Sequence, residues 1–261
     1  MGGCTVTLNG KVSRVRCETP VAPGDLVAIQ YEKVIAIAPR RTTLCRTDPA
    51  NKHRQRVIAA NIDLLVIVAS IDDPPFRPGL VDRYLVAAAR GGIDPILCVN
   101  KADLSTPEQI AEAVNRFAIP WVRCSTKTGE GIEELRVLLA GKLTVLAGHS
   151  GVGKSSVLNA LAGAAVARTG GISEGTKRGQ HTTTSSSLVD LGDGARVIDT
   201  PGIRAFDPGQ LTLAELRAAF PDFDSNACRF ADCTHRTEPD CACRDEGSAR
   251  YASWLRLAVD L

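Results

Sequence analysis

The sequence lacks the apolar segments that membrane and secreted proteins need. Its longest uninterrupted apolar run, LLVIVA, covers only residues 64–69, whereas a transmembrane helix requires about 20 apolar residues. The N-terminus, MGGCTVTLNG, has neither the basic start nor the apolar stretch of a secretory signal. We therefore expect a cytoplasmic protein that does not contact a membrane.

A large excess of one charge is also missing. The 31 basic and 29 acidic residues leave a net charge of +2, so nucleic-acid binding would require local clusters of basic residues. The sequence contains no internal repeat and no low-complexity segment. Its 261 residues, of which 44% are hydrophobic, suffice for two domains or for one domain with appendages. We expect the protein to be a monomer.

A disulfide framework is not expected, because the cytosol is reducing. The chain nevertheless has nine cysteines. Five are scattered, and we predict that they are small hydrophobic core residues: Cys4, Cys17, Cys45, Cys98 and Cys124. The other four lie together between residues 228 and 243 and need a separate explanation.

The first part of the chain predicts a small β-module. The segments CTVTLNGKVSRVRC, DLVAI and KVIAIA alternate apolar and polar residues, and turn residues separate them at Asn9-Gly10 and Pro23-Gly24-Asp25. No helical period is present. We predict a small β-barrel within residues 1–47.

From about residue 56, apolar strands alternate with helical segments. Strands are predicted over residues 63–70, 94–100, 121–125, 142–148, 185–191 and 195–200, and helices over residues 79–92, 107–118 and 132–141. This alternation predicts an α/β domain over residues 48–208, with a mostly parallel sheet, helices on both faces and ligands at the carboxyl ends of the strands. The polar, glycine-rich segment 167–184 predicts a mobile loop.

Residues 145–159, VLAGHSGVGKSSVLN, are typical of a strand, a phosphate-binding loop and the start of a helix. Backbone N–H groups of such a loop and the helix N-terminus bind phosphates. Lys154 would reach the β- and γ-phosphates, and the Ser155 hydroxyl would bind Mg²⁺. The predicted nucleotide contacts here are Gly148, His149, Ser150, Gly151, Val152, Gly153, Lys154, Ser155 and Ser156.

A second motif, NKAD at residues 100–103, follows a predicted strand and indicates which base is bound. The Asp103 carboxylate can accept hydrogen bonds from the ring N1–H and the exocyclic amine of guanine, a donor pair that adenine lacks on one edge. Asn100 would contact N7 or a neighbouring loop, and the Lys101 stem would cover the ring. In the following segment, CSTKTGEG, Ser125 and Thr126 could present N–H groups to guanine O6.

The third motif is DTPG at residues 199–202. Asp199 would hold Mg²⁺ directly or through water, and the Gly202 N–H would contact the γ-phosphate. The predicted ligands are therefore GTP or GDP with Mg²⁺. Most GTPases place the phosphate loop first and the base-recognition motif last, whereas here the base motif comes first. This order predicts a circularly permuted GTPase domain, with the DTPG switch leading directly into the C-terminal tail.

These motifs resemble the RsgA family, the bacterial ribosome small-subunit-dependent GTPases. The resemblance rests on GHSGVGKSSVLN, HTTT and DTPG, on PVAPGDLV, PRRTTLCR and VIAANIDLLVIVAS at the junction with the barrel, and on CRFADCTHRTEPDCAC near the C-terminus. It implies an OB barrel, a permuted GTPase domain and a zinc-binding tail. It also implies GTP hydrolysis during late maturation of the small ribosomal subunit, with that subunit and its rRNA as partners.

A glutamine that orients the attacking water follows the aspartate motif in many GTPases, but this chain has Ile203 there. His181, in the predicted loop, can orient water or accept its proton, and the resemblance supports this catalytic role. The alternative is a histidine that contacts rRNA. Thr182 or Thr183 would complete the contacts with Mg²⁺ and the γ-phosphate.

The tail, residues 209–261, contains two predicted helices and the motif Cys228-x4-Cys233-x-His235-x5-Cys241. Three cysteines and a histidine suit one tetrahedral Zn²⁺ with no open position, which is a structural site. Cys243 could compete with Cys241 as the fourth ligand, and the resemblance favours Cys241.

The resemblance also implies that the N-terminal barrel is one strand short. Basic residues gather at its junction with the GTPase domain and could bind RNA phosphates: Arg40, Arg41, Arg46, Lys52, Arg54 and Arg56. Further basic residues stand in the loop and the tail: Lys177, Arg178, Arg229, Arg236 and Arg244. The alternative is a solvated basic linker.

We therefore predict a GTPase that the small ribosomal subunit stimulates. Three alternatives remain at this point: a nucleotide-gated RNA-binding scaffold that hardly hydrolyses GTP, an ATP-dependent enzyme, and a zinc-containing RNA-binding module with a vestigial nucleotide site. Asp103 argues against ATP, and the intact Lys154, Ser155 and Asp199 argue against a vestigial site.

Overall fold

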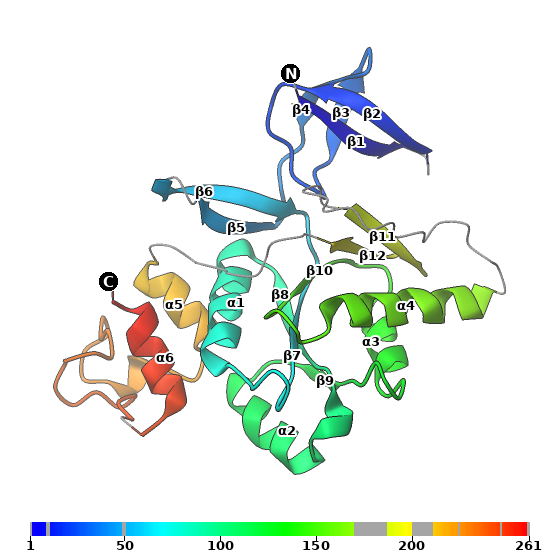
Figure 1. Cartoon of the computed structure of the whole chain (residues 1–261). Helices are drawn as coiled ribbons and strands as arrows, with labels where there is room; N and C mark the ends of the chain where they lie inside the picture. The colour runs from blue at the N-terminus through cyan, green and yellow to red at the C-terminus, as the bar shows by residue number, and fades with distance from the viewer. Residues whose placement is uncertain are drawn as a thin grey trace.

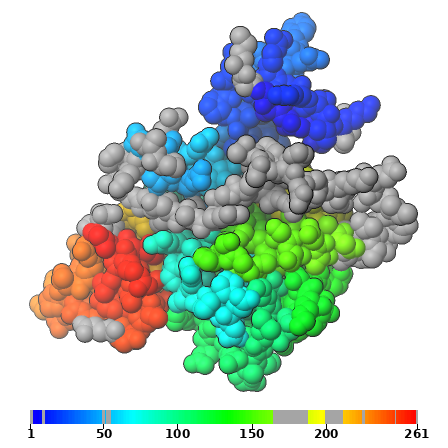
Figure 2. Space-filling model, in the orientation of Figure 1, coloured from blue at the N-terminus to red at the C-terminus, as the bar shows by residue number. Residues whose placement is uncertain are grey.

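The computed structural model describes residues 2–8, 11–48, 51–169, 187–199, 211–223, 225–245 and 247–259. Figure 1 shows an N-terminal sheet at the top, a central sheet flanked by helices, and a C-terminal group of helices and loops at one side. In the space-filling view of the same face, the N-terminal sheet stands out from the body and the tail adjoins the central helices (Figure 2). Within the described ranges, no helix is long and apolar enough to span a membrane.

The central sheet confirms the predicted α/β pattern. Among the described residues its strand order is β11-β12-β10-β7-β8-β9. The strands are β7 (Leu64–Ala69), β8 (Asp94–Val99), β9 (Trp121–Arg123), β10 (Leu143–Ala147), β11 (Ser187–Gly192) and β12 (Ala195–Asp199). All neighbours pair in parallel except β11, which is antiparallel to β12.

Helices cover both faces of this sheet. β7 is buried along its whole length, and its side chains alternate between two hydrophobic clusters. On one face lie α1 (Pro78–Gly91) and α2 (Pro107–Val114), and on the other lie α3 (Ile132–Leu139) and α4 (Lys154–Thr169). A strand that is apolar on both sides therefore becomes the centre of a three-layer domain.

Local sequence signals explain the helix ends. α1 has Pro78 at its first position and is followed by the cap residue Gly92, whose φ of 65° is the left-handed conformation that glycine adopts readily. α2 begins with a capping box between Thr106 and Gln109. α4 continues through residues 167–169, so the prediction that a loop begins at residue 167 is wrong for these three residues; the alanine-rich sequence at this end favours a helix. The rest of that loop lies outside the described residues.

The N-terminal β-module is confirmed, but a closed barrel is not. The strands β1 (Gly2–Leu8), β2 (Lys11–Cys17), β4 (Lys33–Ile37) and β3 (Val27–Gln30) form an open sheet in this order, and β5 (Thr43–Asp48) pairs only with β6 (Asn51–Ala60) among the described residues. Within the described part of the four-stranded sheet only Val15 and Val34 are buried apolar residues. So few buried side chains cannot fill the interior of a barrel.

The prediction for the scattered cysteines was right for two and wrong for three. Cys98 and Cys124 are completely buried, whereas Cys45 is only partly buried. Cys4 and Cys17 are bonded to each other as a disulfide that joins β1 to β2. The two strands pair side by side in antiparallel orientation.

A turn joins the N-terminal sheet to the central domain. The Ala60 N–H donates to the Pro23 carbonyl oxygen over 2.9 Å. A Cβ atom on Gly24 would lie 2.0 Å from the Ala60 carbonyl oxygen, so this close approach requires glycine. Asp25, with a side chain 2% exposed, binds both the Ala22 N–H and the Arg40 guanidinium.

The tail packs on α1. Its helices are α5 (Leu213–Ala219) and α6 (Ala249–Leu257), and it has a short 3₁₀ turn at Ser225–Ala227. Two further 3₁₀ turns, Ala102–Leu104 and Asn115–Phe117, lie in the central domain on either side of α2. The fully buried Trp254 ring stacks on Phe223 with centroids 5.0 Å apart and meets the Phe220 ring edge-on. These rings belong to the same hydrophobic cluster as the inner face of α1, so the tail and the central domain share a core.

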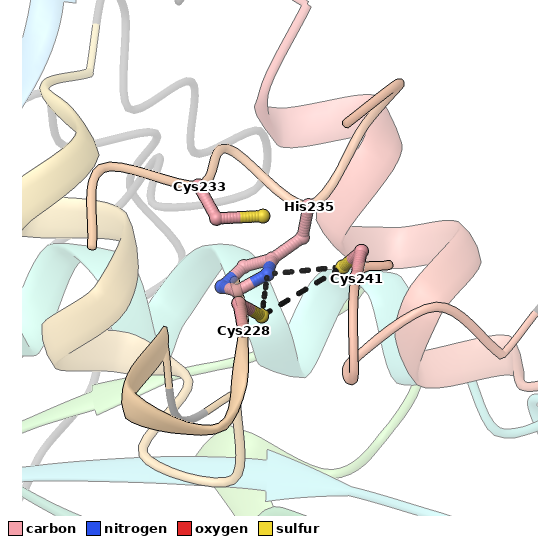
Figure 3. Close-up of side chains that lie close together, drawn as sticks. All are labelled: Cys228, Cys233, His235 and Cys241. Atoms are coloured by element: carbon pink, nitrogen blue, oxygen red, sulfur yellow. Dashed lines mark hydrogen bonds between the residues drawn. The ribbon is translucent and has the colours of Figure 1, made fainter. Parts of the chain in front are cut away.

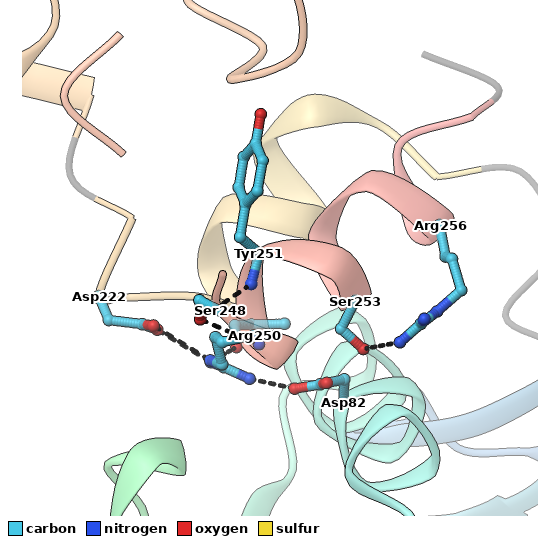
Figure 4. Close-up of polar contacts among 8 residues, drawn as sticks. Asp82, Asp222, Ser248, Arg250, Tyr251, Ser253 and Arg256 are labelled. Atoms are coloured by element: carbon cyan, nitrogen blue, oxygen red, sulfur yellow. Dashed lines mark hydrogen bonds and ion pairs between the residues drawn. The ribbon is translucent and has the colours of Figure 1, made fainter. Parts of the chain in front are cut away.

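A buried ion-pair network fastens α6 to α1 (Figure 4). Arg250 binds Asp82 of α1 and Asp222 after α5, and its guanidinium lies 4.0 Å from the centroid of the Phe220 ring. Asp82 is 1% exposed, and its burial raises the pKa of its carboxyl group despite the neighbouring Ser253 hydroxyl and Arg250. Removing the Arg250 charge would leave the buried Asp82 carboxylate without its ion-pair partner, which is strongly destabilising.

Candidate nucleotide site and metal centre

The predicted nucleotide motifs meet at one edge of the central sheet. Gly148 follows β10, Asn100 follows β8, and Ser125 lies just beyond β9. Since β10, β7, β8 and β9 run in parallel, their carboxyl ends lie at the same edge. β12, which ends at Asp199, is also parallel to β10. Segments far apart in the sequence are therefore brought to one place.

Asn100 connects the base motif with the phosphate-binding loop. Its side chain is 1% exposed; Nδ2 donates to the Val152 carbonyl oxygen over 2.9 Å, and Oδ1 accepts from the Thr126 N–H over 3.3 Å. A Cβ atom on Gly153 would lie 2.3 Å from Asn100 Nδ2. The glycine of the loop is therefore required for the asparagine to reach it.

The phosphate-binding loop has the backbone that its glycines permit. Gly148, Gly151 and Gly153 have φ values of 141°, 88° and 92°. Lys154 begins α4, and its Nζ donates to the carbonyl oxygens of Gly148 and His149, both over 2.8 Å. The ammonium group is thus held over the loop, beside the N–H groups of the first helical turn.

The remaining residues of the loop divide between core and surface. Val152 is 3% exposed and packs into the cluster beneath α4. Gly151, Ser155 and Ser156 are exposed, and the Nδ1 atom of His149 lies 2.6 Å from the Ser150 carbonyl oxygen. The exposed face of the loop is therefore polar and accessible to a ligand.

Asp103 is held by the neighbouring loop. Its Oδ1 accepts from the Ser125 hydroxyl over 2.6 Å, and Lys127 Nζ lies 3.5 Å from Oδ2. The hydrogen bond from Ser125 has the largest effect and lowers the pKa of Asp103; desolvation opposes it, and the Lys127 charge lowers the pKa further. The carboxylate is consequently ionised at neutral pH and can accept further hydrogen bonds.

The structure differs from the prediction for the guanine O6 contacts. The Ser125 N–H donates to the Glu130 carbonyl oxygen over 2.9 Å, and the Thr126 N–H donates to Asn100. Both N–H groups therefore already have acceptors within the protein. The Ser125 side chain instead positions Asp103 and accepts from the Thr128 N–H over 3.2 Å.

Tyr84 of α1 lies beside the candidate site, and sequence reasoning missed it. It is completely buried and lines a small cavity together with Gly148, His149 and Arg77. Burial raises the pKa of its phenol, opposed by a hydrogen bond with the backbone of Gly148. In the sequence it is one apolar position in an amphipathic helix, and no local signal distinguishes it.

Several predicted site residues fall outside the described ranges. They are His181, Thr182, Thr183 and Gly202, and the Asp199 side chain. The backbone of Asp199 is described and ends β12 at the edge that carries the phosphate-binding loop.

The four predicted metal ligands are brought together in the tail (Figure 3). One ligand atom each from Cys228, Cys233, His235 and Cys241 lies within 4.8 Å of the others. The Nδ1 atom of His235 is 3.5 Å from Cys228 Sγ and 3.3 Å from Cys241 Sγ. Burial and the Arg217 charge lower the pKa of His235, which keeps its imidazole neutral, the form that binds metal.

The surroundings of this centre fit a structural zinc ion. The sulfurs form a soft donor set with no open position. The Tyr251 hydroxyl donates to the His235 carbonyl oxygen over 2.9 Å, and Trp254 Nε1 donates to the Thr234 carbonyl oxygen over 2.8 Å. The cluster is therefore fixed to α6. Cys243 stands outside the four-ligand group and contacts Cys228.

Comparison with known proteins decides the family. A family model described as RsgA GTPase matches residues 37–208, more than half of the chain. The chain belongs to the RsgA GTPase family.

Two relatives illustrate how far the similarity to RsgA proteins extends. The chain is 37% identical over 281 residues to a protein from Porphyromonas gingivalis, covering 98% of this chain and 89% of the relative. It is 40% identical over 279 residues to a protein from Chlorobaculum tepidum, covering 98% and 90%. Both relatives are named small ribosomal subunit biogenesis GTPase RsgA.

Solved structures show the same fold. The crystal structure of YjeQ from Thermotoga maritima matches with a TM-score of 0.75 and 26% identity over 99% of this chain and 97% of that one. YloQ, described as a circularly permuted GTPase, matches with a TM-score of 0.68 and 25% identity over 99% and 91%. The predicted RsgA resemblance and the permuted GTPase fold are thereby confirmed.

Proposed function

We propose that this RsgA-family GTPase binds GTP and Mg²⁺ at the carboxyl edge of its central sheet and hydrolyses GTP on the small ribosomal subunit during late maturation. The hydrogen bond from Asn100 to Val152 is the observation that carries the nucleotide site, because it joins the base motif to the phosphate-binding loop. The names of the relatives support the ribosomal partner. A cytoplasmic location follows from the same partner.

Each motif is proposed to bind a different part of the nucleotide. Asp103 accepts hydrogen bonds from guanine, Asn100 holds the base loop against the phosphate loop, and Lys154 moves from the carbonyl oxygens of Gly148 and His149 to the β- and γ-phosphates. The exposed N–H groups between Gly148 and Ser156 bind the phosphates. Mg²⁺, when bound, neutralises phosphate charge, and Ser155 and Asp199 would hold it with Thr182 or Thr183.

His181 is the proposed catalytic residue. It lies outside the described residues, so its support is its position before the threonine run and the isoleucine at position 203, where a water-orienting glutamine is often found. A neutral imidazole would orient the attacking water and accept its proton. Binding of the subunit would place this side chain, which explains why the subunit should stimulate turnover.

The basic residues at the junction differ in role. Arg40 forms an ion pair with Asp25, and Arg41 forms one with Asp63 over 2.5 Å. Arg46 and Arg56 lie directly opposite each other in the β5–β6 hairpin. Like charges in this arrangement are unfavourable unless an anion lies between them. We propose that this hairpin contacts rRNA phosphates.

The tail would be stabilised by one Zn²⁺ held by Cys228, Cys233, His235 and Cys241. We also propose the division into an N-terminal β-module at 1–47, a GTPase domain at 48–208 and a zinc-binding tail at 209–261. The β5–β6 hairpin crosses the first boundary, and the family match begins at residue 37. The hairpin therefore works as the link between module and GTPase domain.

The test is GTP turnover with and without purified small ribosomal subunits, for the wild type and for His181→Ala. Stimulation by the subunit that is lost in the variant, with GTP affinity retained, is the expected result. Equal turnover with and without subunits would reject stimulation. The alternative of a nucleotide-gated scaffold with little hydrolysis predicts no difference between wild type and variant.

A further inference from the structure

The loop between β7 and α1 contacts both halves of the proposed nucleotide site. We call residues 71–76 the connector. Its ends are closed by a hydrogen bond from the Phe76 N–H to the Ile71 carbonyl oxygen over 2.8 Å, and Ser70 Oγ donates to the Pro74 carbonyl oxygen over 2.7 Å. Asp72 and Pro75 form an isolated β-bridge across it. The connector is therefore a compact turn with a defined shape.

Two side chains, one in the base motif and one just after it, bind this turn. Ser105 Oγ donates to Asp72 Oδ2 over 2.5 Å, and Lys101 Nζ lies 2.9 Å from Asp73 Oδ2. On its other side, the connector approaches the phosphate-binding loop, since a Cβ atom on Gly151 would lie 3.6 Å from Pro74 Cδ. The connector thus spans the distance between the base and phosphate parts of the site.

Lys101 is the residue that the Asp73 contact orders. Its backbone is in the left-handed conformation, with φ of 60°, and it immediately precedes the 3₁₀ turn that carries Asp103. A free lysine side chain has four rotatable bonds and loses up to about 2 kcal/mol of conformational entropy when it is fixed. With its ammonium held at Asp73, the methylene stem is already ordered before a base stacks on it.

We propose that Asp73 is a positioning residue for guanine-nucleotide binding, which acts by holding the Lys101 stem where it covers the base. The inference rests on the proposed nucleotide site and adds a residue outside its motifs. Ordering the stem in advance lowers the entropy that the bound base must offset. Nucleotide release then requires the Lys101 stem to move, and the ion pair opposes that movement.

The size of the effect follows from the exposure of the pair. The Lys101 and Asp73 side chains are 28% and 75% exposed, and exposed ion pairs contribute little because water and salt screen them. Asp73→Asn should therefore accelerate GDP release by about two- to fivefold. High ionic strength should accelerate release from the wild type and have a smaller effect on the variant, because the ion pair is already absent there.

The experiment measures release of fluorescent mant-GDP and the affinity for pyrophosphate, which has phosphates but no base, on the full-length protein. Asp94→Asn is the matched control, because it removes the same charge from the other end of the same sheet. Removal of an acidic charge by itself would strengthen the binding of any anion, pyrophosphate and GDP alike. Weaker GDP binding together with unchanged or tighter pyrophosphate binding would therefore show that the substitution affects the contact with the base. Asp73→Glu, which can restore the ion pair, should release GDP at close to the wild-type rate.

The outcomes are separable. Faster mant-GDP release in Asp73→Asn only, with pyrophosphate binding retained, supports the positioning role. An unchanged release rate overturns it. A parallel loss of GDP and pyrophosphate affinity also overturns it, because the substitution would then disturb the phosphate loop through Pro74. If the wild type binds pyrophosphate but not GDP, the proposed guanine site fails and the inference fails with it.

Discussion

The amide nitrogen of Asn100 lies 2.9 Å from the carbonyl oxygen of Val152, and this hydrogen bond joins two motifs that stand 52 positions apart. Because Asn100 is buried, the contact is shielded from competing water. It makes the phosphate-binding loop and the base-binding segment one structural unit. The permuted order of the motifs is thus compatible with an intact site, since parallel strands bring their carboxyl ends together in any chain order.

Replacing Asn100 with alanine should damage both stability and nucleotide binding. The change leaves the Val152 carbonyl oxygen and the Thr126 N–H without their partner, and an unsatisfied buried polar group costs about 1–3 kcal/mol. Urea denaturation should report this loss, and calorimetry should show weaker GDP binding. Asn115→Ala, at the end of α2, is the control and should retain GDP affinity. Unchanged stability and affinity in Asn100→Ala would show that the link is dispensable.

The metal centre predicts different outcomes for two neighbouring cysteines. Cys241 belongs to the four-ligand group, whereas Cys243 does not. Cys241→Ser should reduce the zinc content below one ion per chain and lower the thermal midpoint, because zinc binding contributes to folding. Cys243→Ser should retain zinc. Elemental analysis of both variants decides the matter, and the reverse pattern would make Cys243 the ligand.

Asp25 should make the stability of the chain depend on pH. Burial alone would raise the pKa of its carboxyl group, but hydrogen bonds from Arg40 and the Ala22 N–H lower it below 3.8 overall. Because the pKa of Asp25 is lower in the folded state than in the unfolded state, the ionised carboxylate stabilises the fold above pH 3.8. This stabilisation is lost as the pH falls through the folded-state pKa. Asp25→Asn should therefore cost about 1–3 kcal/mol at pH 7.

The pH profile supplies the check. The difference in unfolding free energy between wild type and Asp25→Asn should be constant near neutrality and should shrink below about pH 4. Glu18→Gln is the matched control, since Glu18 pairs with Lys33 on the surface and exposed pairs contribute little to stability. A pH-independent difference for Asp25→Asn would mean that ionisation of Asp25 is not the source of its effect.

Sequence motifs could predict candidate site residues where chemistry dictates residue types at fixed spacings. A phosphate loop needs glycines at Gly148 and Gly153, and guanine recognition needs a carboxylate such as Asp103. Alternating apolar strands and helices were sufficient for the central sheet. The metal cluster was also predictable, because Cys228, Cys233, His235 and Cys241 carry suitable ligands within a short segment, and the structure brings them together.

The missed features depend on contacts between distant segments. Tyr84 and Asp73 are ordinary positions in a helix and a loop until folding places them beside Gly148 and Lys101. In the sequence, Arg40 belongs to a basic cluster of the kind that binds nucleic acid, but in the structure it pairs with the Asp25 carboxylate in the turn at residues 22–25. A small barrel was predicted from strand alternation, which does not reveal how many side chains are available to fill an interior.

The most direct measurement of the shared pocket is calorimetric titration of GDP and ADP with Mg²⁺ into wild type, Asp103→Asn and Lys154→Ala. Asp103 lies in the base motif and Lys154 in the phosphate-binding loop, the two motifs whose order in the chain is reversed. Tight GDP binding by the wild type, weak ADP binding, and a loss of GDP affinity of about tenfold or more in each variant are predicted, since charged hydrogen bonds contribute about 1.5–3 kcal/mol. GDP affinity that is insensitive to Asp103 while Lys154 remains essential would contradict a single guanine-nucleotide pocket.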